Sequence, residues 1–279
     1  MSKQRKTVVT PSGLIAYQEK GTGPAALFVH GVFLNGDLWS GVTEIGSSVR
    51  RCLSPDLLCH GHTQERADAD VSLAGQAQML REFVDSLELE RVDLIANDTG
   101  GAIAQIFAAR NPQRIRSLAL TNCDTHDGWP PEAFMPVVAQ ARSGQLPGLL
   151  RMLAADPKLA RQAFAIGFEN PEVLTDDAVH AFFDPLISSP ERIAQIERFF
   201  HAFDCAQTVE IEPLLKKLEA PTLIVWGTGD AFFDVRWAYW LRDTIPGTRR
   251  LVELIGARLF FPFERAEQLS GELLLHWRA

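Results

Sequence analysis

A strand that turns directly into a helix at Asp98 is the feature that most restricts how this chain can fold. Residues 92–96 form a short apolar run typical of a strand, and residues 100–110 have helical spacing. Such a tight turn needs small residues two positions either side of its centre, and the chain has Ala96 and Gly100 there. The sequence therefore predicts Asp98 at the N-terminus of a helix, whose dipole favours a carboxylate over a carboxylic acid.

Around this turn, apolar runs alternate with helical patterns, which predicts an α/β fold with a mostly parallel sheet and helices on both faces. Eight runs are strand-like: residues 7–9, 14–19, 25–29, 50–54, 92–96, 115–121, 222–226 and 249–254. Between residues 124 and 218 the pattern is helical only, with stretches at 131–142, 149–167, 175–183 and 190–203. We therefore expect a core domain of residues 1–123 and 219–279, and a helical cap (lid) of residues 124–218 over the carboxyl ends of the strands.

Charge and composition limit the partners. The formal net charge of −8 argues against nucleic acid and anionic membranes, which attract basic surfaces. No run approaches the roughly 20 apolar residues of a membrane span, and four scattered cysteines predict reduced thiols and no metal site. We expect a cytoplasmic protein with a small-molecule substrate and no cofactor, and the oligomeric state stays open.

Three further motifs surround the turn. They are FVHGV at 28–32, DLLCHGHT at 56–63 and VWGTGD at 225–230. Together with the turn, which matches the small-x-nucleophile-x-Gly elbow, they resemble the α/β-hydrolase family over essentially the whole chain. An aspartate in the elbow is similar to the epoxide-hydrolase and haloalkane-dehalogenase branch of that family.

This resemblance implies roles for four residues. Asp98 would be the nucleophile that forms an alkyl-enzyme ester, and Asp230 would be the triad acid. The backbone N–H groups of Val32 and Thr99 would form the oxyanion hole. In the enzymes of this branch, a histidine then activates the water that cleaves the ester.

The histidine is missing here. The segment IGARLFFP at 255–262 places Leu259 at the expected position, with Arg258 beside it. Thr99 and Val32 also stand where dehalogenases have halide-binding side chains, and neither tyrosine of the chain falls in the predicted lid, where epoxide hydrolases have them.

Beyond a predicted strand, His126 is the best candidate by position to replace the histidine as an acid or base, and a merely solvated loop histidine is the alternative. Asp124, two residues earlier, lies where some dehalogenases have their triad acid and is a candidate for a role in the active site. Without an imidazolium between Asp98 and Asp230, one carboxyl group could hold a proton, or Arg258 could neutralise Asp230. Either arrangement would make Asp98 a general base.

Candidate substrate contacts lie beside these motifs. They are His30, Phe33, Trp129, Phe232, Phe233, Arg258 and Leu259. His30 could equally brace its loop by hydrogen bonds. The predicted lid is rich in aromatic side chains, most of which we expect to form its own core: Trp129, Phe134, Phe164, Phe168, Phe182, Phe183, Phe199, Phe200 and Phe203.

Three functions remain open on the sequence. The first is a hydrolase that uses Asp98 as a nucleophile on an apolar small molecule such as an epoxide or an alkyl halide. The second uses Asp98 for proton transfer without a covalent intermediate, in hydrolase, lyase or isomerase chemistry. The third is a non-catalytic small-molecule binder, which has little need of so strained a turn.

Overall fold

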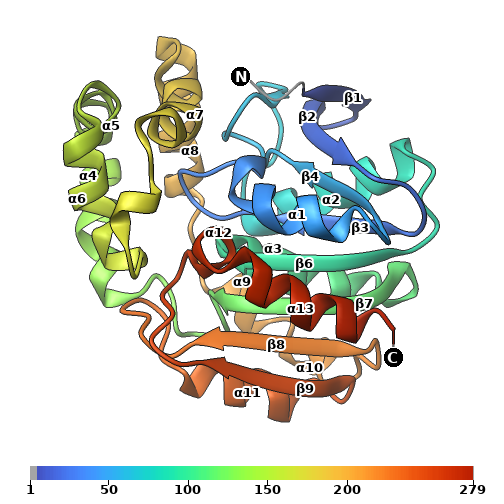
Figure 1. Ribbon diagram of the computed structural model, residues 1–279. Coiled ribbons are helices and arrows are strands. Elements are labelled where there is room, and N and C mark those ends of the chain that lie inside the picture. The colour runs from blue at the N-terminus through green and yellow to red at the C-terminus, as the bar shows by residue number, and fades with distance from the viewer. Residues whose placement is uncertain (1–4, 279) are drawn as a thin grey trace.

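One sheet runs through the molecule, with strand order β1-β2-β4-β3-β6-β7-β8-β9 and the two-residue β5 paired to β2 (Figure 1). The computed structural model describes residues 5–278. The strands are β1 (Lys6–Thr10), β2 (Gly13–Lys20), β3 (Ala25–Val29), β4 (Arg51–Pro55), β5 (Gln64–Glu65), β6 (Val92–Asp98), β7 (Ile115–Cys123), β8 (Thr222–Gly227) and β9 (Thr248–Leu254). Only the pairs that involve β2 are antiparallel. The predicted mostly parallel α/β fold is confirmed, and β5 is the one strand that the sequence pattern missed.

Strand β6 lies near the middle of the sheet, between β3 and β7. All seven of its residues are buried. A strand covered on both faces favours apolar side chains throughout, and residues 92–96 are apolar apart from Asp93. The carboxyl end of β6 is therefore held rigidly in the interior, and Asp98 is its last residue.

Helices cover both faces of the sheet (Figure 1). Helix α1 (Ser40–Gly46) packs against α13 (Ala266–His276) on one face, and α2 (Leu73–Ser86) packs against α3 (Thr99–Arg110) on the other. Helix α3 is buried from Thr99 to Ala109. The remaining core elements are η1 (Gly36–Trp39), η2 (Pro112–Arg114), α11 (Arg236–Thr244) and α12 (Phe261–Glu264). The element that carries Asp98 into the site is therefore packed on every side.

Between β7 and β8, in what we call the helical segment (residues 124–221), the structure has helices and no strand. These are η3 (Glu132–Phe134), α4 (Met135–Arg142), α5 (Leu146–Ala155), α6 (Pro157–Phe164), η4 (Ala165–Gly167), η5 (Pro171–Val173), α7 (Asp176–Ile187), α8 (Pro190–His201), α9 (Ala206–Val209) and α10 (Glu212–Leu215). Helices α4 to α8 lie beside the carboxyl ends of the central strands (Figure 1).

Two details of this segment differ from the sequence expectation. The stretch predicted at 149–167 is two helices and a short 3-10 turn, because Pro157 has no N–H to continue α5, and the Asp156 side chain instead caps α6 at two backbone N–H groups. Helices α9 and α10 pack against α3 of the core, although they fall inside the predicted lid range.

Two arginines of α8 hold the helical segment on the core. Arg192 donates to the carbonyl oxygens of Gly61 and Thr63 and pairs with Glu65. Arg198 donates to the carbonyl oxygens of Ala67 and Ala69. Because guanidinium groups offer several donors in a fixed plane, these contacts fix α8 against one stretch of core loop.

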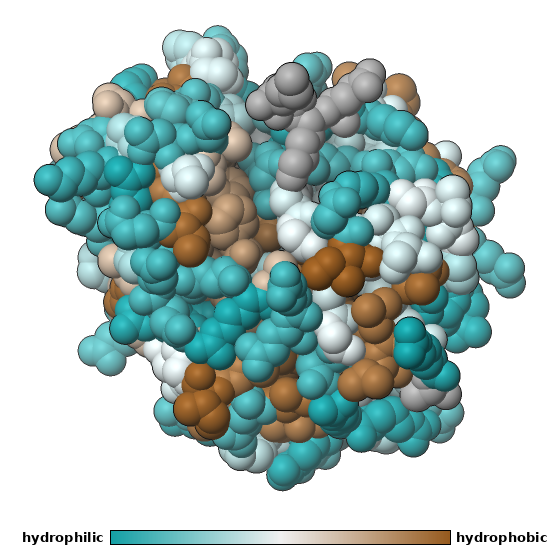
Figure 2. All heavy atoms as spheres, viewed as in Figure 1, coloured by the Kyte–Doolittle hydropathy of each residue, from teal (hydrophilic) through white to brown (hydrophobic). Residues whose placement is uncertain are grey.

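The surface seen in Figure 2 is mostly hydrophilic, with apolar atoms gathered in a hollow between the helical segment and the core. Within residues 5–278, no helix is both long enough and apolar enough to cross a membrane.

The packing of α3 against β3 gives a test of the fold. A Cβ atom at Gly100 would lie 2.3 Å from the His30 carbonyl oxygen and 2.6 Å from that of Val29. Backbone atoms of a buried strand cannot move aside easily, so we expect Gly100→Ala to lower the free energy of unfolding by about 1–3 kcal/mol. Gly271→Ala is the matched control, since no heavy atom lies within 4 Å of its added Cβ. Urea unfolding of both variants measures the difference; equal stabilities would contradict the tight packing.

Candidate active site

Asp98 occupies the turn between β6 and α3 in a strained conformation, with φ 56° and ψ −138°. Side chains other than glycine rarely adopt positive φ, and residues that do are concentrated at functional sites. The side chain makes no cap hydrogen bond to its own helix, so Asp98 does not serve as a side-chain cap of α3. The turn instead presents the carboxylate to the region beyond the sheet.

The loop after β3 passes directly beneath this carboxylate. A Cβ at Gly31 would lie 2.0 Å from Asp98 Oδ2, so only glycine fits there. The next residue, Val32, donates its backbone N–H to the same oxygen at 2.9 Å. The backbone N–H of Thr99 also stabilises the ionised form of this carboxyl group and lowers its pKa. Val32 and Thr99 therefore lie where the predicted oxyanion hole requires them, and their catalytic role remains a prediction.

Asp124, at the end of β7, lies beside the elbow. Its Oδ2 accepts a 2.6 Å hydrogen bond from Thr99 Oγ1, and only 2% of the residue is exposed. Gln105 of α3 donates to the Asp124 carbonyl oxygen at 2.9 Å and fixes the backbone. The residues of 5–278 offer no hydrogen-bond partner to Asp124 Oδ1. The structure thus brings Asp98 and Asp124 together, as two of the four residues predicted to be catalytic.

Asp230 follows β8 and is held by the core. Asn122 Nδ2 donates to Asp230 Oδ2 at 2.6 Å, and the Phe232 N–H donates to Asp230 Oδ1 at 2.8 Å. Asn122 also bonds both backbone polar groups of Gly227. Asp230 does not line the cavity described below. Its hydrogen bonds anchor the loop that carries Phe232 and Phe233.

Burial and neighbouring charge control these three carboxyl groups. Burial, Asp124 and Asp230 raise the pKa of Asp98 well above its ordinary value, against the lowering effect of the Val32 and Thr99 N–H groups. Burial raises the pKa of Asp124 to about 7 and that of Asp230 to about 6. The low dielectric of the interior destabilises the ionised form of each carboxyl group, and repulsion between like charges destabilises it further. With a pKa of about 7, Asp124 is therefore partly protonated at neutral pH.

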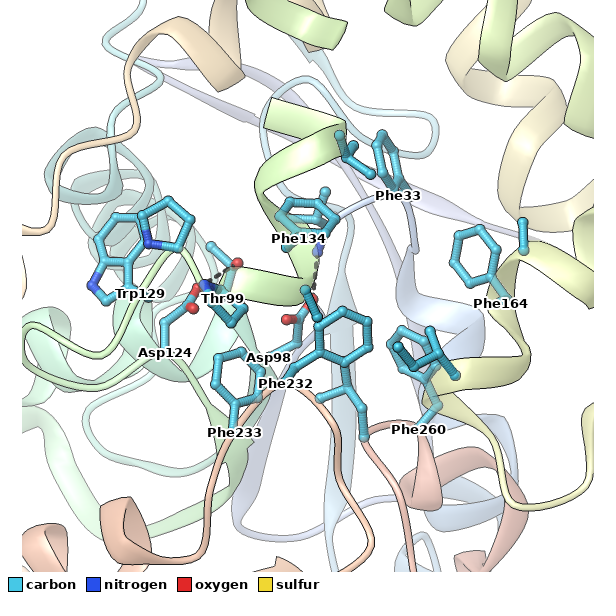
Figure 3. Close-up of a pocket in the computed structure, with 18 of the residues that line it drawn as sticks. Phe33, Asp98, Thr99, Asp124, Trp129, Phe134, Phe164, Phe232, Phe233 and Phe260 are labelled. Atoms are coloured by element: carbon cyan, nitrogen blue, oxygen red, sulfur yellow. Dashed lines mark hydrogen bonds between the residues drawn. The ribbon is translucent and has the colours of Figure 1, made fainter. Parts of the chain in front are cut away.

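A cavity of about 170 Å³ opens over Asp98 (Figure 3). Its described lining contains four side chains with polar atoms: Asp98, Thr99, Asp124 and Trp129. The Trp129 indole N–H is already bound to Thr208 Oγ1 at 2.6 Å. The rest of the lining is apolar: Val32, Phe33, Pro130, Pro131, Ala133, Phe134, Val137, Leu149, Leu153, Ala163, Phe164, Ile166, Phe203, Phe232, Phe233, Leu259 and Phe260. The cavity therefore suits an uncharged, apolar ligand.

Leu259 lines the cavity at the position where the resemblance places a histidine, and it is 3% exposed. Asn97, the residue before Asp98, donates from Nδ2 to the Leu259 carbonyl oxygen at 3.0 Å. This bond ties the loop after β9 to the elbow. The site thus has an isobutyl side chain where a proton-transferring imidazole was expected.

His126 does not take over that place. Its ring nitrogens lie 3.0 Å from Asp127 Oδ1 and 3.1 Å from Glu212 Oε2, and the ring packs on Trp240 with centroids 4.8 Å apart. It is absent from the cavity lining. His126 does lie in the loop after β7, as the sequence predicts. Its backbone has a positive φ of 49°, and its side chain packs against α10 and α11. The expectation of a catalytic base at His126 is therefore corrected.

Two predicted substrate contacts also lie elsewhere. Arg258 donates to the carbonyl oxygens of Ala165 and Phe168, where it ties η4 to the core, and within residues 5–278 it forms no ion pair with Asp230. His30 is fully buried, with Nδ1 2.8 Å from the Gly31 carbonyl oxygen and Nε2 accepting from Leu57 N. Burial lowers the pKa of His30 to about 4, so it is a neutral brace of its loop.

The aromatic residues of the helical segment divide between the cavity and the interior. Trp129, Phe134, Phe164 and Phe203 line the cavity, together with the predicted substrate contacts Phe33, Phe232 and Phe233. The other five are buried within the segment or against the core: Phe168, Phe182, Phe183, Phe199 and Phe200. Helical periodicity predicted a packing role for most of them, but it could not tell which side chains face the cavity.

Asn97 and Asn122 are the supporting residues that sequence reasoning missed. Both are fully buried. A buried amide is costly unless it is hydrogen-bonded, so asparagines at the ends of two apolar strands were the available signal. Lining residues far along the helical segment, such as Leu149 and Ala163, gave no such signal.

Comparison with known proteins agrees with this geometry. Residues 24–264 match the family described as alpha/beta hydrolase fold. An uncharacterised protein of Mycobacterium bovis is 28% identical over 264 residues, which cover 89% of this chain and 73% of that protein. Haloalkane dehalogenase 2 of the same organism is 24% identical over 272 residues, which cover 94% of this chain and 91% of the relative.

Among solved structures, the epoxide hydrolase CorEH without ligand superposes with a TM-score of 0.82 at 16% identity, covering 99% of this chain and 98% of that one. At that identity the likeness concerns the fold alone. With a family match over most of its length, this chain belongs to the α/β-hydrolase-fold family; it is a hydrolase, with sequence similarity to a haloalkane dehalogenase.

Proposed function

We propose that this hydrolase acts on an uncharged apolar small molecule with an electrophilic carbon, an epoxide or a carbon–halogen compound, and that Asp98 is the nucleophile. The observation that carries this proposal is the placement of the Asp98 carboxylate. One oxygen is held by the Val32 N–H at 2.9 Å, and the group faces an apolar cavity. A carboxylate in a dry site is poorly solvated, and it is a competent nucleophile toward carbon.

The same hydrogen bond supports the second half of such a reaction. When water attacks the Asp98 ester, negative charge develops on the carbonyl oxygen. Donors already aligned with that oxygen stabilise the charge without reorganisation. In this proposal the Val32 and Thr99 N–H groups therefore act more strongly in the transition state than in the resting enzyme.

The cavity sets the size and polarity of the substrate. A dry protein cavity of roughly 150 Å³ binds benzene, and this one holds about 170 Å³. The described lining contains no lysine, arginine or histidine to pair with an anion. The chemistry of the walls thus favours a compact, neutral substrate with one aromatic or alicyclic ring, or a short alkyl chain.

A second function is favoured by one specific observation, the raised pKa of Asp98. A raised pKa makes a carboxylate a stronger base, which suits general acid–base catalysis. Asp98 would then move a proton in hydrolase, lyase or isomerase chemistry, and no covalent intermediate would form. The two functions differ in whether Asp98 makes a bond to carbon.

Turnover in ¹⁸O-labelled water separates them. We expect styrene oxide or 1-bromohexane to give label in the Asp98 carboxylate, because water attacks the ester carbonyl and leaves its oxygen on the enzyme. Peptide mass spectrometry of the tryptic fragment measures the label. Asp98→Asn is the control and should lose at least about 100-fold in rate. Product that carries label while the wild-type carboxylate stays unlabelled would contradict the covalent function and favour acid–base chemistry.

The raised pKa of Asp98 also gives an expectation for stability. A carboxyl group with a folded-state pKa above its unfolded value stabilises the fold at low pH, and this stabilisation is lost as pH rises through the folded-state pKa. We therefore expect Asp98→Asn, which cannot ionise, to raise Tm by about 2–4 °C at pH 8 and to leave it unchanged near pH 4.

Thermal unfolding at the two pH values measures this difference. Asp127→Asn is the matched control, because Asp127 is exposed and its hydrogen bond to His126 lowers its pKa. It should bring no gain at pH 8. If Asp98→Asn changed Tm by the same amount at both pH values, removal of the buried negative charge would not be the cause of the change.

A further inference from the structure

The cavity contains few groups that can carry a proton. Of its four polar side chains, the Trp129 N–H is bound to Thr208, and the Thr99 hydroxyl is bound to Asp124. Asp98 and Asp124 are therefore the titratable groups of the described lining. If Asp98 becomes an ester, Asp124 alone is left to exchange protons with substrate and water.

Asp124 is oriented for that task. Thr99 Oγ1 holds its Oδ2 at 2.6 Å, which leaves Oδ1 without a partner within residues 5–278 on a side chain that faces the cavity (Figure 3). Gln105 fixes the Asp124 backbone at 2.9 Å. Because Thr99 directly follows Asp98, the donor that orients Asp124 is part of the elbow that presents the nucleophile.

We propose that Asp124 performs both proton transfers of an epoxide hydrolysis at Asp98, as acid when the ring opens and as base when the ester is cleaved. This rests on the proposed function of Asp98 as nucleophile. Asp124 would take over the work of the absent histidine from within the cavity, on the substrate side of the elbow. Asp230, which does not line the cavity, takes no direct part.

The first step balances with one proton from Asp124. An oxygen of the Asp98 carboxylate forms a bond to a ring carbon, and the carbon–oxygen bond of the epoxide breaks. The oxygen that is released takes the proton of the Asp124 carboxyl group. The products are the Asp98 ester, an adjacent hydroxyl group and the Asp124 carboxylate.

The second step restores the enzyme. The Asp124 carboxylate accepts a proton from a water molecule while the oxygen of that water forms a bond to Asp98 Cγ. The oxyanion that forms on Asp98 accepts a hydrogen bond from Val32 N–H. The intermediate collapses, the bond between Cγ and the substrate oxygen breaks, and the departing alkoxide takes the proton of the new Asp98 carboxylic acid. Asp98 is again a carboxylate, Asp124 is again protonated, and the diol has gained one water.

The charge around Asp124 is consistent with this role. Burial raises its pKa to about 7, near the working pH, where a group can serve as both acid and base. The titratable groups that interact with it are Asp98 from β6 and Cys123 of the preceding strand, and Asp230 from the loop after β8 acts on both of these groups. The described cavity lining includes no basic side chain that would hold Asp124 ionised.

An alkyl bromide provides the internal control for the test, because bromide departs as an anion and needs no proton. Single-turnover alkylation of Asp98 is followed by intact mass spectrometry with styrene oxide and with 1-bromohexane. In Asp124→Asn we expect alkylation by the epoxide to slow by about 100-fold, and alkylation by the bromide to change by no more than about twofold. The adducts from both probes should persist, because no base remains to cleave them.

Several outcomes would overturn this role. In Asp124→Asn, an equal loss of both alkylation rates would indicate a merely structural role. Unchanged epoxide alkylation would exclude the role as acid, and prompt cleavage of the adduct would exclude the role as base. Absence of any adduct in both wild type and variant would instead overturn the nucleophilic function of Asp98. Asp127→Asn, an exposed Asp-to-Asn change in the same loop, should behave as wild type.

The wild-type enzyme gives a second measurement if Asp124→Asn does not fold. Epoxide alkylation should fall as pH rises through about 7, when Asp124 loses the proton that it must donate. Alkylation by the bromide should not fall over that range. Parallel pH profiles for the two probes would overturn the role of Asp124 as the acid.

Discussion

The positive-φ turn at Asp98 is the constraint on which the rest of the site depends. It can exist only where the ends of β3, β6 and β7 meet, because the loop after β3 must pass close enough for Val32 N–H to bond the carboxylate. Gly31 and Gly100 permit that approach, since a Cβ at either would collide with Asp98 or with the His30 backbone. Burial of β6 and α3 stabilises the fold and so offsets the strain of this turn.

The sequence predicted the elements that depend on local pattern. Strands and the strand-to-helix turn follow from short apolar runs and from turn residues at fixed spacing, and these are properties of neighbouring residues. The positions of Val32 and Thr99 beside Asp98 were implied by the family resemblance. The end of one helix before Pro157 could have been predicted in the same way as the strands, because proline cannot continue a helix. The predicted helical stretch at 149–167 missed this break. The cavity depends instead on how the helical segment is docked, through contacts such as those of Arg192 with the loop after β4.

Side-chain direction in loops was the other limit. His126 and Asp124 are two residues apart beyond β7, and sequence position alone did not separate them. Asp124 directly follows β7 and is held by Thr99, whereas His126 lies in a turn and reaches Glu212 instead. The hydrogen-bond partners separate the two residues: Asp124 has a hydroxyl donor from the elbow itself, and the imidazole has a carboxylate partner outside the cavity.

Leucine at position 259 links the two unusual properties of the site. An apolar side chain there removes a base, and it also places no positive charge beside Asp98 and Asp124, whose pKa values are raised by burial. An imidazolium in the same place would lower both pKa values and leave Asp124 a poorer acid. In the proposed mechanism, the apolar side chain at position 259 therefore accounts both for the absence of a basic histidine and for the ability of Asp124 to donate a proton.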